Sequence, residues 1–316
     1  MNTAVKTLKL IFLLLPTAWL VLWSCSAPKE GSSYGTVTIT SDESLQPMVK
    51  QLTEAFEGIY PNAHFNVLYR PEQQAVSLMI RDSARLVFTT RLFTAQEEQF
   101  FKQEGIRYNP QPIATDGLAL VIHPQNKDSL TTMSELSRLF KGQIKDWSQL
   151  KGSNRSGKIT LVFDNANSSN LNFMMRTFGL TDVKNLNIFS AGSNQKVIEH
   201  IRNNPNALGF IGVNWISDGD LAQTAQLSKG VRIMGVSAKE NPTSIADYFQ
   251  PFQRDLGLKN YPLHRKIYVI SREMTGGLGS GLINYIVRDV GSLVIEKCGL
   301  WPEKPFNREV YLQKGN

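Results

Sequence analysis

The sequence predicts an α/β protein with mixed, mostly parallel sheets, and three observations carry this prediction. Short segments rich in β-branched residues alternate with segments of helical period over about 280 residues. The run Leu118–His123 is continuously apolar, which is typical of a strand buried on both faces. No repeat of fixed period and no low-complexity tract interrupts the alternation, so a solenoid is excluded.

The elements follow one another in a regular order. The expected strands are 36–40, 64–69, 85–89, 118–123, 158–163, 207–212 and 268–271. The expected helices are 45–57, 75–81, 95–103, 133–140, 171–178, 196–203 and a long final helix 282–296. Two of these helices follow capping boxes, Thr94-x-x-Glu97 and Thr132-x-x-Glu135.

Composition excludes several classes of protein. The chain has 316 residues, of which 41% are hydrophobic and 19% are charged, which excludes a disordered or collagen-like chain. It has only two cysteines, Cys25 and Cys298, so a disulfide framework is excluded as well. The net charge is +7. A mild positive field of this size helps to attract an anion.

The first 35 residues have the layout of an export signal and a tether. Residues 1–25 carry Lys6 and Lys9, no acidic residue, and then an apolar run. Leu22-Trp-Ser-Cys25 resembles the lipobox of bacterial lipoproteins, in which the cysteine is diacylated and becomes the mature N-terminus. We therefore expect a signal peptide at 1–25, a lipid anchor at Cys25 and a tether at 26–35. An uncleaved anchor or a buried apolar helix is the alternative.

Processing at this site changes the charge and the role of the second cysteine. Removal of residues 1–25 leaves 32 basic and 27 acidic residues, a net charge of +5. If Cys25 is lipidated, Cys298 is expected to be a buried small residue in the last helix.

Two strand ends could hold a small oxyanion. The strand 36–40 runs through Ser41-Asp-Glu-Ser44 into a helix, and the strand 158–163 runs through 164–170 into another. A helix N-terminus presents unpaired N–H groups and the positive end of the dipole, so two such turns facing each other would form an anion cage. Ordinary N-capping by the same residue types is the alternative for each turn taken singly.

Several motifs in order resemble those of one family. They are TITSDESLQP (38–47), FEGIYP (56–61), DGLA (116–119), FKGQIKDW (140–147), NPNALGF (204–210) and YPLHR (261–265). Their order and spacing resemble the periplasmic phosphate-binding protein family, the substrate-binding lipoproteins of phosphate ABC transporters.

The resemblance implies a two-lobed periplasmic-binding-protein (type II) fold with a hinged cleft. Lobe I is expected at 36–125 plus 262–316 and lobe II at 126–261. The implied function is the capture of phosphate or a related oxyanion for an ABC importer, by a monomer without enzymatic activity, cofactor or metal. The implied partners are an ABC permease and, through lipidated Cys25, a membrane, which places the protein in a bacterial periplasm or cell envelope.

The resemblance also implies which residues bind the anion. The matching neutral donors are the backbone N–H groups and hydroxyls of Ser41, Ser44, Thr90, Ser168 and Ser169. Arg91 would balance charge, and Asp116 or Asp42 would accept the proton of HPO4²⁻ and so exclude sulfate. Asp164 stands near the position where the family commonly has an arginine. A carboxylate there weakens anion binding unless it points away or pairs with a cation such as Arg91.

Three other functions remain to be compared with this one. A sensor or interaction protein could use the same fold with a degraded anion site, and the departure at Asp164 favours it. Ser193-x-x-Lys196 matches part of the penicillin-binding serine site, but no Ser-Asp-Asn or Lys-Thr-Gly follows, so Ser193 is interpreted as a helix N-cap. The only compact basic group, 264–266, lacks interleaved aromatic residues, which argues against nucleic-acid binding. The scattered histidines argue against a metal site.

Overall fold

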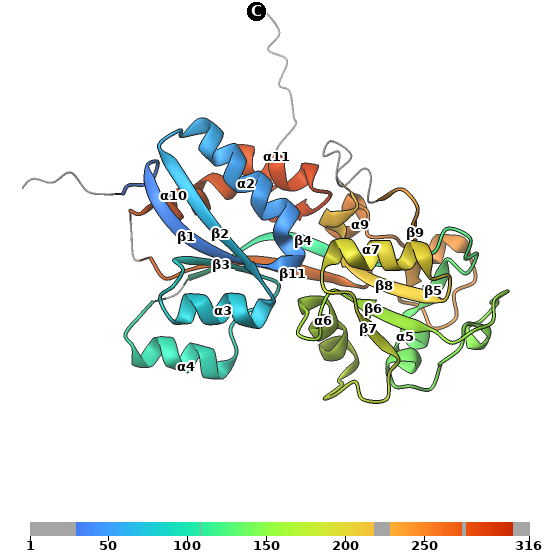
Figure 1. The fold of residues 1–316 in the computed structure, drawn as a ribbon. Coiled ribbons are helices and arrows are strands. Elements are labelled where there is room, and N and C mark those ends of the chain that lie inside the picture. The colour runs from blue at the N-terminus through green and yellow to red at the C-terminus, as the bar shows by residue number, and fades with distance from the viewer. Residues whose placement is uncertain (1–29, 108, 218–227, 274–275, 306–316) are drawn as a thin grey trace, which may run out of the picture.

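A computed structural model describes residues 30–107, 109–217, 228–273 and 276–305. The predicted signal peptide and Cys25 lie outside these residues. The structure contains one large curved sheet with the strand order β2-β1-β3-β11-β4-β8-β6-β7, and two short strands, β9 and β12, also pair with β4 (Figure 1). Helices cover both faces of this sheet, so the predicted α/β class is confirmed.

The strands alternate with helices in the predicted order. The strands are β1 (Gly35–Asp42), β2 (Ala63–Arg70), β3 (Leu86–Thr89), β4 (Asn109–Ile122), β5 (Leu130–Thr132), β6 (Thr160–Phe163), β7 (Ile188–Ser190), β8 (Ala207–Gly212), β9 (Arg232–Ile233), β10 (Gly235–Ser237), β11 (His264–Ser271) and β12 (Trp301–Pro302). The α-helices are α2 (Gln46–Ile59), α3 (Glu72–Ile80), α4 (Ala95–Gln103), α5 (Met133–Phe140), α6 (Ser169–Phe178), α7 (Asn194–Asn203), α9 (Gln253–Gly257), α10 (Leu278–Ile286) and α11 (Asp289–Lys297). Short 3-10 helices are η1 (Glu43–Leu45), η2 (Trp147–Gln149), η3 (Val213–Trp215) and η4 (Ile245–Asp247).

The sheet has two parallel ends joined by antiparallel strands. At one end β1 pairs in parallel with β2 and β3, and at the other β6 pairs in parallel with β7 and β8. Between them, the first half of β4 pairs antiparallel with β11, and its second half pairs antiparallel with β8. β4 therefore passes from one half of the molecule into the other, and its end Leu118–Ile122 is fully buried, as the apolar run predicts.

Each half of the sheet carries helices on both faces. In Figure 1, α2, α10 and α11 lie on one side of β1–β3, and α3 and α4 lie on the other. In the second half, α7 lies on one side of β6 and β8, and α5 and α6 lie on the other. One apolar cluster runs through both halves, and a smaller one fills the space around α3 and α4.

The predicted long final helix 282–296 is wrong. The structure has two helices, α10 and α11, which meet at an angle of 71°. Arg288 between them is extended (φ −100°, ψ 174°), and a Cβ on Gly291 would lie only 2.5 Å from the Cα of Ile286. The chain therefore turns where glycine permits a close approach of the two helices. Cys298 follows α11 directly and is buried.

The described part of the predicted tether is packed on the folded body. The Gly31 N–H donates to the Tyr34 carbonyl, and the Gly35 N–H donates to the Asn62 carbonyl. The main chain at Ser32 also lies so close to Gly281 that no side chain fits there. The folded body thus includes residues 31–35, ahead of the expected start at Thr36, because glycines at both contacts allow the segment to fold back.

The helices are short for a membrane span. Within the described residues no single helix has the length and apolar composition to cross a membrane, and only the bent pair of α10 and α11 meets these two criteria together. Its apolar residues Leu278, Leu282, Ile286 and Ile295 belong to the main core cluster.

Candidate functional site

The carboxyl ends of the parallel strands from the two halves face one another. β1 ends at Asp42, and its in-register neighbours place the ends of β2 and β3 beside it. From the other half, β6 ends just before Asp164, and β8 ends at Gly212. Loops at the carboxyl ends of such strands are the usual place for ligands in open α/β sheets. The structure thus brings together the two turns that the sequence analysis selected.

A buried arginine lies at this junction. Arg265 on β11 is only 4% exposed. Its Nε donates to Oδ2 of Asp116 at 3.0 Å, and its Nη2 forms an ion pair with the same oxygen at 2.9 Å. Nη2 donates hydrogen bonds to Oδ1 of Asn170 at 2.8 Å and to Oγ of Ser44 at 3.3 Å. The guanidinium carbon lies 5.8 Å from the centre of the Phe173 ring. Among the described residues, Nη1 has no hydrogen-bond partner although it is buried.

The two opposed turns contact each other directly. The hydroxyls of Ser44 and Ser169 are 3.1 Å apart, and the Ser44 hydroxyl also donates to Oδ2 of Asp42 at 2.5 Å. The Ser44 carbonyl accepts hydrogen bonds from Nδ2 of Asn214 at 3.0 Å and Nε1 of Trp215 at 2.9 Å. Ser169 is the first residue of α6, so this contact lies at a helix N-terminus that favours negative charge.

Burial raises the pKa values of two acidic residues in the site. Burial and, after it, the nearby charge of Glu72 raise the pKa of Asp42 to about 7, although Arg265 and the hydroxyls of Ser169 and Ser44 act to lower it. Burial also raises the pKa of Asp116, and the Arg265 charge opposes that rise. The Asp42 carboxyl group can therefore hold a proton near neutral pH and share it with a bound anion.

The end of β3 is occupied by a carboxylate of the chain. Oε1 of Glu72 accepts hydrogen bonds from Oγ1 of Thr89 (2.9 Å), from N of Thr90 (2.9 Å) and from Oγ1 of Thr90 (2.7 Å). Oε2 of Glu72 lies 3.4 Å from Nε of Arg91, whose two Nη atoms also bind Glu97 at 2.7 and 2.9 Å. The predicted anion donors Thr90 and Arg91 therefore bind Glu72 in this structure.

Two further predicted donors, Ser41 and Ser168, form hydrogen bonds within their own turns. The Ser41 hydroxyl donates to the Asp42 carbonyl at 2.9 Å. The Ser168 hydroxyl donates to Asp164 and accepts from the first N–H groups of α6, so it acts as the N-cap. Of the predicted residues, the structure brings together Asp42, Ser44, Asp116 and Ser169 around Arg265.

The Asp164 carboxylate has hydrogen-bond partners other than Arg91. It is 1% exposed, and its carboxylate accepts from the Ser168 hydroxyl and from Nδ2 of Asn165 at 3.0 Å. Burial raises the pKa of Asp164, and the hydrogen bond from Ser168 opposes that rise. Arg91, offered above as one possible partner for Asp164, binds Glu72 and Glu97 instead.

Sequence reasoning missed Glu72, Asn170 and Arg265. In the sequence, Arg265 stands out only as part of the motif 261–265 and of the compact basic group 264–266. A signal for it exists in the alternation of β11, because Arg265, Ile267 and Val269 are alternate, buried residues of the strand. A charged residue at such a position requires a buried partner.

A cleft opens beside Glu72 and Arg91. It has a volume of about 570 Å³ and is lined from the α3–α4 side by Glu72 and Arg91, and from the α6 side by Asn172 and Arg176. These two helical layers lie on opposite sides of the gap in Figure 1. Burial lowers the pKa of Arg176, and the Glu72 charge opposes this shift.

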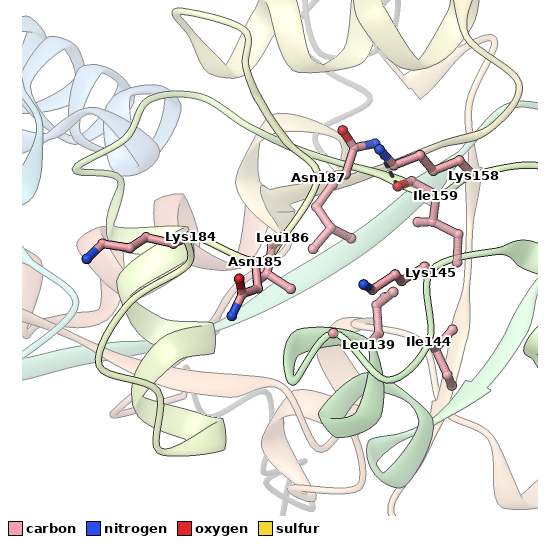
Figure 2. A pocket seen from close by; sticks show the side chains of 11 residues that line it. Leu139, Ile144, Lys145, Lys158, Ile159, Lys184, Asn185, Leu186 and Asn187 are labelled. Atoms are coloured by element: carbon pink, nitrogen blue, oxygen red, sulfur yellow. Dashed lines mark hydrogen bonds between the residues drawn. The ribbon is translucent and has the colours of Figure 1, made fainter.

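A second pocket of about 210 Å³ lies away from this junction, near α5 and β6. Figure 2 shows Lys145 and Lys158 at its rim, Leu139 and Ile159 on its wall, and Lys184 directed away from the other two lysines. Its lysines therefore do not converge on one point. Among the residues that the structure describes, no group of three or more His, Cys, Asp or Glu side chains could hold a metal ion.

The fold and the facing strand ends define a two-lobed binding protein. A family model described as the PBP superfamily domain matches residues 26–290, and the chain belongs to this superfamily. It is similar to the phosphate-binding protein PstS of Bacillus subtilis (strain 168), with 23% identity over 311 residues that cover 94% of this chain and 95% of the relative.

Two solved structures share the fold. An ABC-type phosphate transport receptor from Vibrio cholerae has a TM-score of 0.62 and 21% identity, covering 84% of this chain and 99% of the receptor. A high-affinity periplasmic phosphate-binding protein, PfluDING, bound with phosphate, has a TM-score of 0.63 and 10% identity, covering 84% of this chain and 90% of that protein. The expected periplasmic-binding-protein fold is therefore confirmed.

Proposed function

We propose that this protein captures phosphate or a related oxyanion between its two lobes and delivers it to an ABC importer. One observation carries the proposal: the buried Arg265 guanidinium lies between the opposed strand ends, and its Nη1 has no partner among the described residues. A buried unpaired donor is costly unless a ligand completes it. Nδ2 of Asn194 and Oδ1 of Asn214, next to the same cluster, are likewise buried without partners.

The chemistry of the junction suits a protonated oxyanion. Nη1 of Arg265 supplies a charged donor, and the hydroxyls of Ser44 and Ser169 can exchange their mutual contact for hydrogen bonds to anion oxygens. Asp42 is the better acceptor for the phosphate proton, because Asp116 already binds Arg265 and the N–H of Val213. Sulfate carries no proton at neutral pH. A sulfate oxygen would therefore lie against the Asp42 carboxylate with no hydrogen to share between the two acceptors.

Comparison with relatives supports phosphate as the anion. The relative that aligns over nearly the whole chain is a phosphate-binding protein, and two proteins of the same fold are described as a phosphate transport receptor and a phosphate-binding protein. The alternative of a sensor or interaction protein, which the departure at Asp164 favours, is also supported by the occupation of Thr90 and Arg91 by Glu72.

The division into lobes and the anchoring are part of this proposal. The lobes are 36–125 plus 262–316 and 126–261, with β4 and β11 as the strands that join them. A signal peptide at 1–25 and lipidation of Cys25 would hold the protein, as a monomer, at the envelope face of a bacterial membrane beside its permease. Electrophoretic mobility and metabolic labelling with a fatty acid would test Cys25, and a Cys25→Ala variant is the control.

Calorimetry tests the binding function. Phosphate, sulfate and molybdate are titrated into the chain that begins at residue 26. We expect phosphate to bind and sulfate to bind at least about tenfold more weakly, because sulfate leaves two acceptors in contact. The absence of heat and of thermal stabilisation with all three anions would contradict the proposal.

We propose no catalytic role. Ser193 is the N-cap of α7, and its hydroxyl accepts from the Lys196 N–H at 3.3 Å, so it is engaged in capping. A labelled penicillin is expected to leave Ser193 unmodified, and acylation would revive the serine-enzyme alternative.

A further inference from the structure

Glu72 binds the donor set that an oxyanion would use. Two hydroxyls, one main-chain N–H and one guanidinium converge on its carboxylate, which is 1% exposed at the N-terminus of α3. Hydroxyls, amides and an arginine at a helix N-terminus are also the groups that proteins use to bind free anions. The Glu72 carboxylate thus occupies a complete anion site with an anion that belongs to the chain.

The positive charge of Arg91 is already balanced by a carboxylate other than Glu72. Arg91 already makes two hydrogen bonds to Glu97, at 2.7 and 2.9 Å. The second carboxylate therefore adds a buried negative charge beside the cleft rather than completing an unpaired cation.

The Glu72 charge also acts on the neighbouring Arg265 junction. After burial, it is the largest cause that raises the pKa of Asp42, which binds Ser44. A free anion between the lobes would experience the same repulsion. Glu72 also lines the cleft through which Arg176 faces α3 and α4.

We propose that Glu72 limits the affinity for the free oxyanion, because it is a tethered carboxylate that fills the anion donors at the end of β3 and competes with that oxyanion. This inference rests on the function proposed above. It explains why Thr90 and Arg91, which suit an anion, bind the chain itself. It also implies that the protein binds phosphate less tightly than its own donors would permit.

The test is a titration of inorganic phosphate into the purified protein and its Glu72→Gln variant. Glutamine preserves the volume and an acceptor oxygen but removes the charge, so phosphate affinity should rise by about tenfold. Glu97→Gln is the matched control, because Glu97 binds the same arginine from the outer side, and its affinity should stay within about threefold of the wild type. Glu72→Ala is the second variant if Glu72→Gln does not unfold cooperatively.

A double variant separates competition from a structural role. In Glu72→Gln/Thr90→Val the freed hydroxyl is absent, so the affinity gained by Glu72→Gln should fall back toward the wild-type value. A purely structural Glu72 predicts no gain in either variant.

The outcomes also separate this inference from the proposed function. If the wild type binds phosphate through Arg265 and Glu72→Gln does not bind more tightly, the inference is overturned and the function stands. If no variant binds phosphate, both are overturned. Binding by Glu72→Gln alone supports the competition and contradicts phosphate capture by the natural chain.

Discussion

Two arginine–carboxylate clusters, one around Arg91 and one around Arg265, differ in how completely they are paired. Arg91 is half-buried, and its guanidinium binds Glu72 and Glu97. Arg265 is almost fully buried, shares one oxygen of Asp116 through two nitrogens, and retains a buried Nη1 without a partner in the described chain. The cluster that is closed to solvent is therefore the one with a donor left for a ligand.

The difference shows what makes an arginine a binding residue. The charge of a guanidinium alone does not select an anion site, because the carboxylates of the chain can satisfy it completely. A buried donor without an acceptor has an uncompensated free energy of desolvation. A ligand that accepts a hydrogen bond from this donor can offset that free energy. The two clusters should therefore respond differently to substitution.

The largest effect is expected for Arg265→Gln. Phosphate binding should fall by more than about 100-fold, since the charge-assisted donor is lost, and the free energy of unfolding should fall by about 3–5 kcal/mol because Asp116 remains buried without its partner. Calorimetry and urea unfolding measure the two quantities. Arg91→Gln is the control and should weaken binding much less. Equal losses of phosphate affinity in Arg265→Gln and Arg91→Gln would show that the two clusters do not differ in binding.

A smaller effect is expected for Ser169→Asp. The new carboxylate would face Ser44 and any anion held there, so phosphate affinity should fall by at least about tenfold through like-charge repulsion. The neighbouring Ser168→Ala variant provides the comparison. It removes the N-cap of α6 and should cost about 1 kcal/mol of unfolding free energy while leaving affinity nearly unchanged. Unchanged affinity in Ser169→Asp would show that this turn does not face the ligand.

The last effect is on stability rather than on binding and concerns the proton of Asp42. Its folded-state pKa, about 7, lies above the ordinary value of 3.8, so between these values the folded protein binds more protons than the unfolded chain. This group therefore makes stability fall as pH rises from about 4 to 7, by at most about 1.4 kcal/mol per pH unit. Urea midpoints of wild type and Asp42→Asn from pH 5 to 8 should diverge accordingly. Parallel curves would show that the carboxyl is not held protonated.

Local sequence signals predicted the helix starts well. The capping boxes of Thr94 with Glu97 and of Thr132 with Glu135 are both formed, and Ser193 caps α7 as predicted. Such caps depend on residues within three positions of one another, so the sequence contains them completely. The prediction of one final helix failed because the break near Gly291 depends on how closely two helices pack.

The site could be predicted only in part, because several of its contacts join residues that are distant in the sequence. The turns that carry Ser44 and Ser169 follow predicted strands, and parallel strands place their carboxyl ends together. Glu72 could not be assigned to Thr90, since the bond joins residues 18 positions apart on different elements. Arg265 and Asp116 are separated by 149 positions and meet only through the register of β11 on β4.

The sequence alone determined the α/β class, the order of most elements and the polar residues at the two opposed turns. These properties follow from local periodicity and from short-range capping. Only the tertiary structure decided which polar groups remain available to a ligand. Hydrogen-bond satisfaction is a property of all neighbours in space. Thr90 and Arg91 are therefore engaged by a distant glutamate, while the buried Arg265 on a neighbouring strand keeps a donor, Nη1, that has no partner among the residues described.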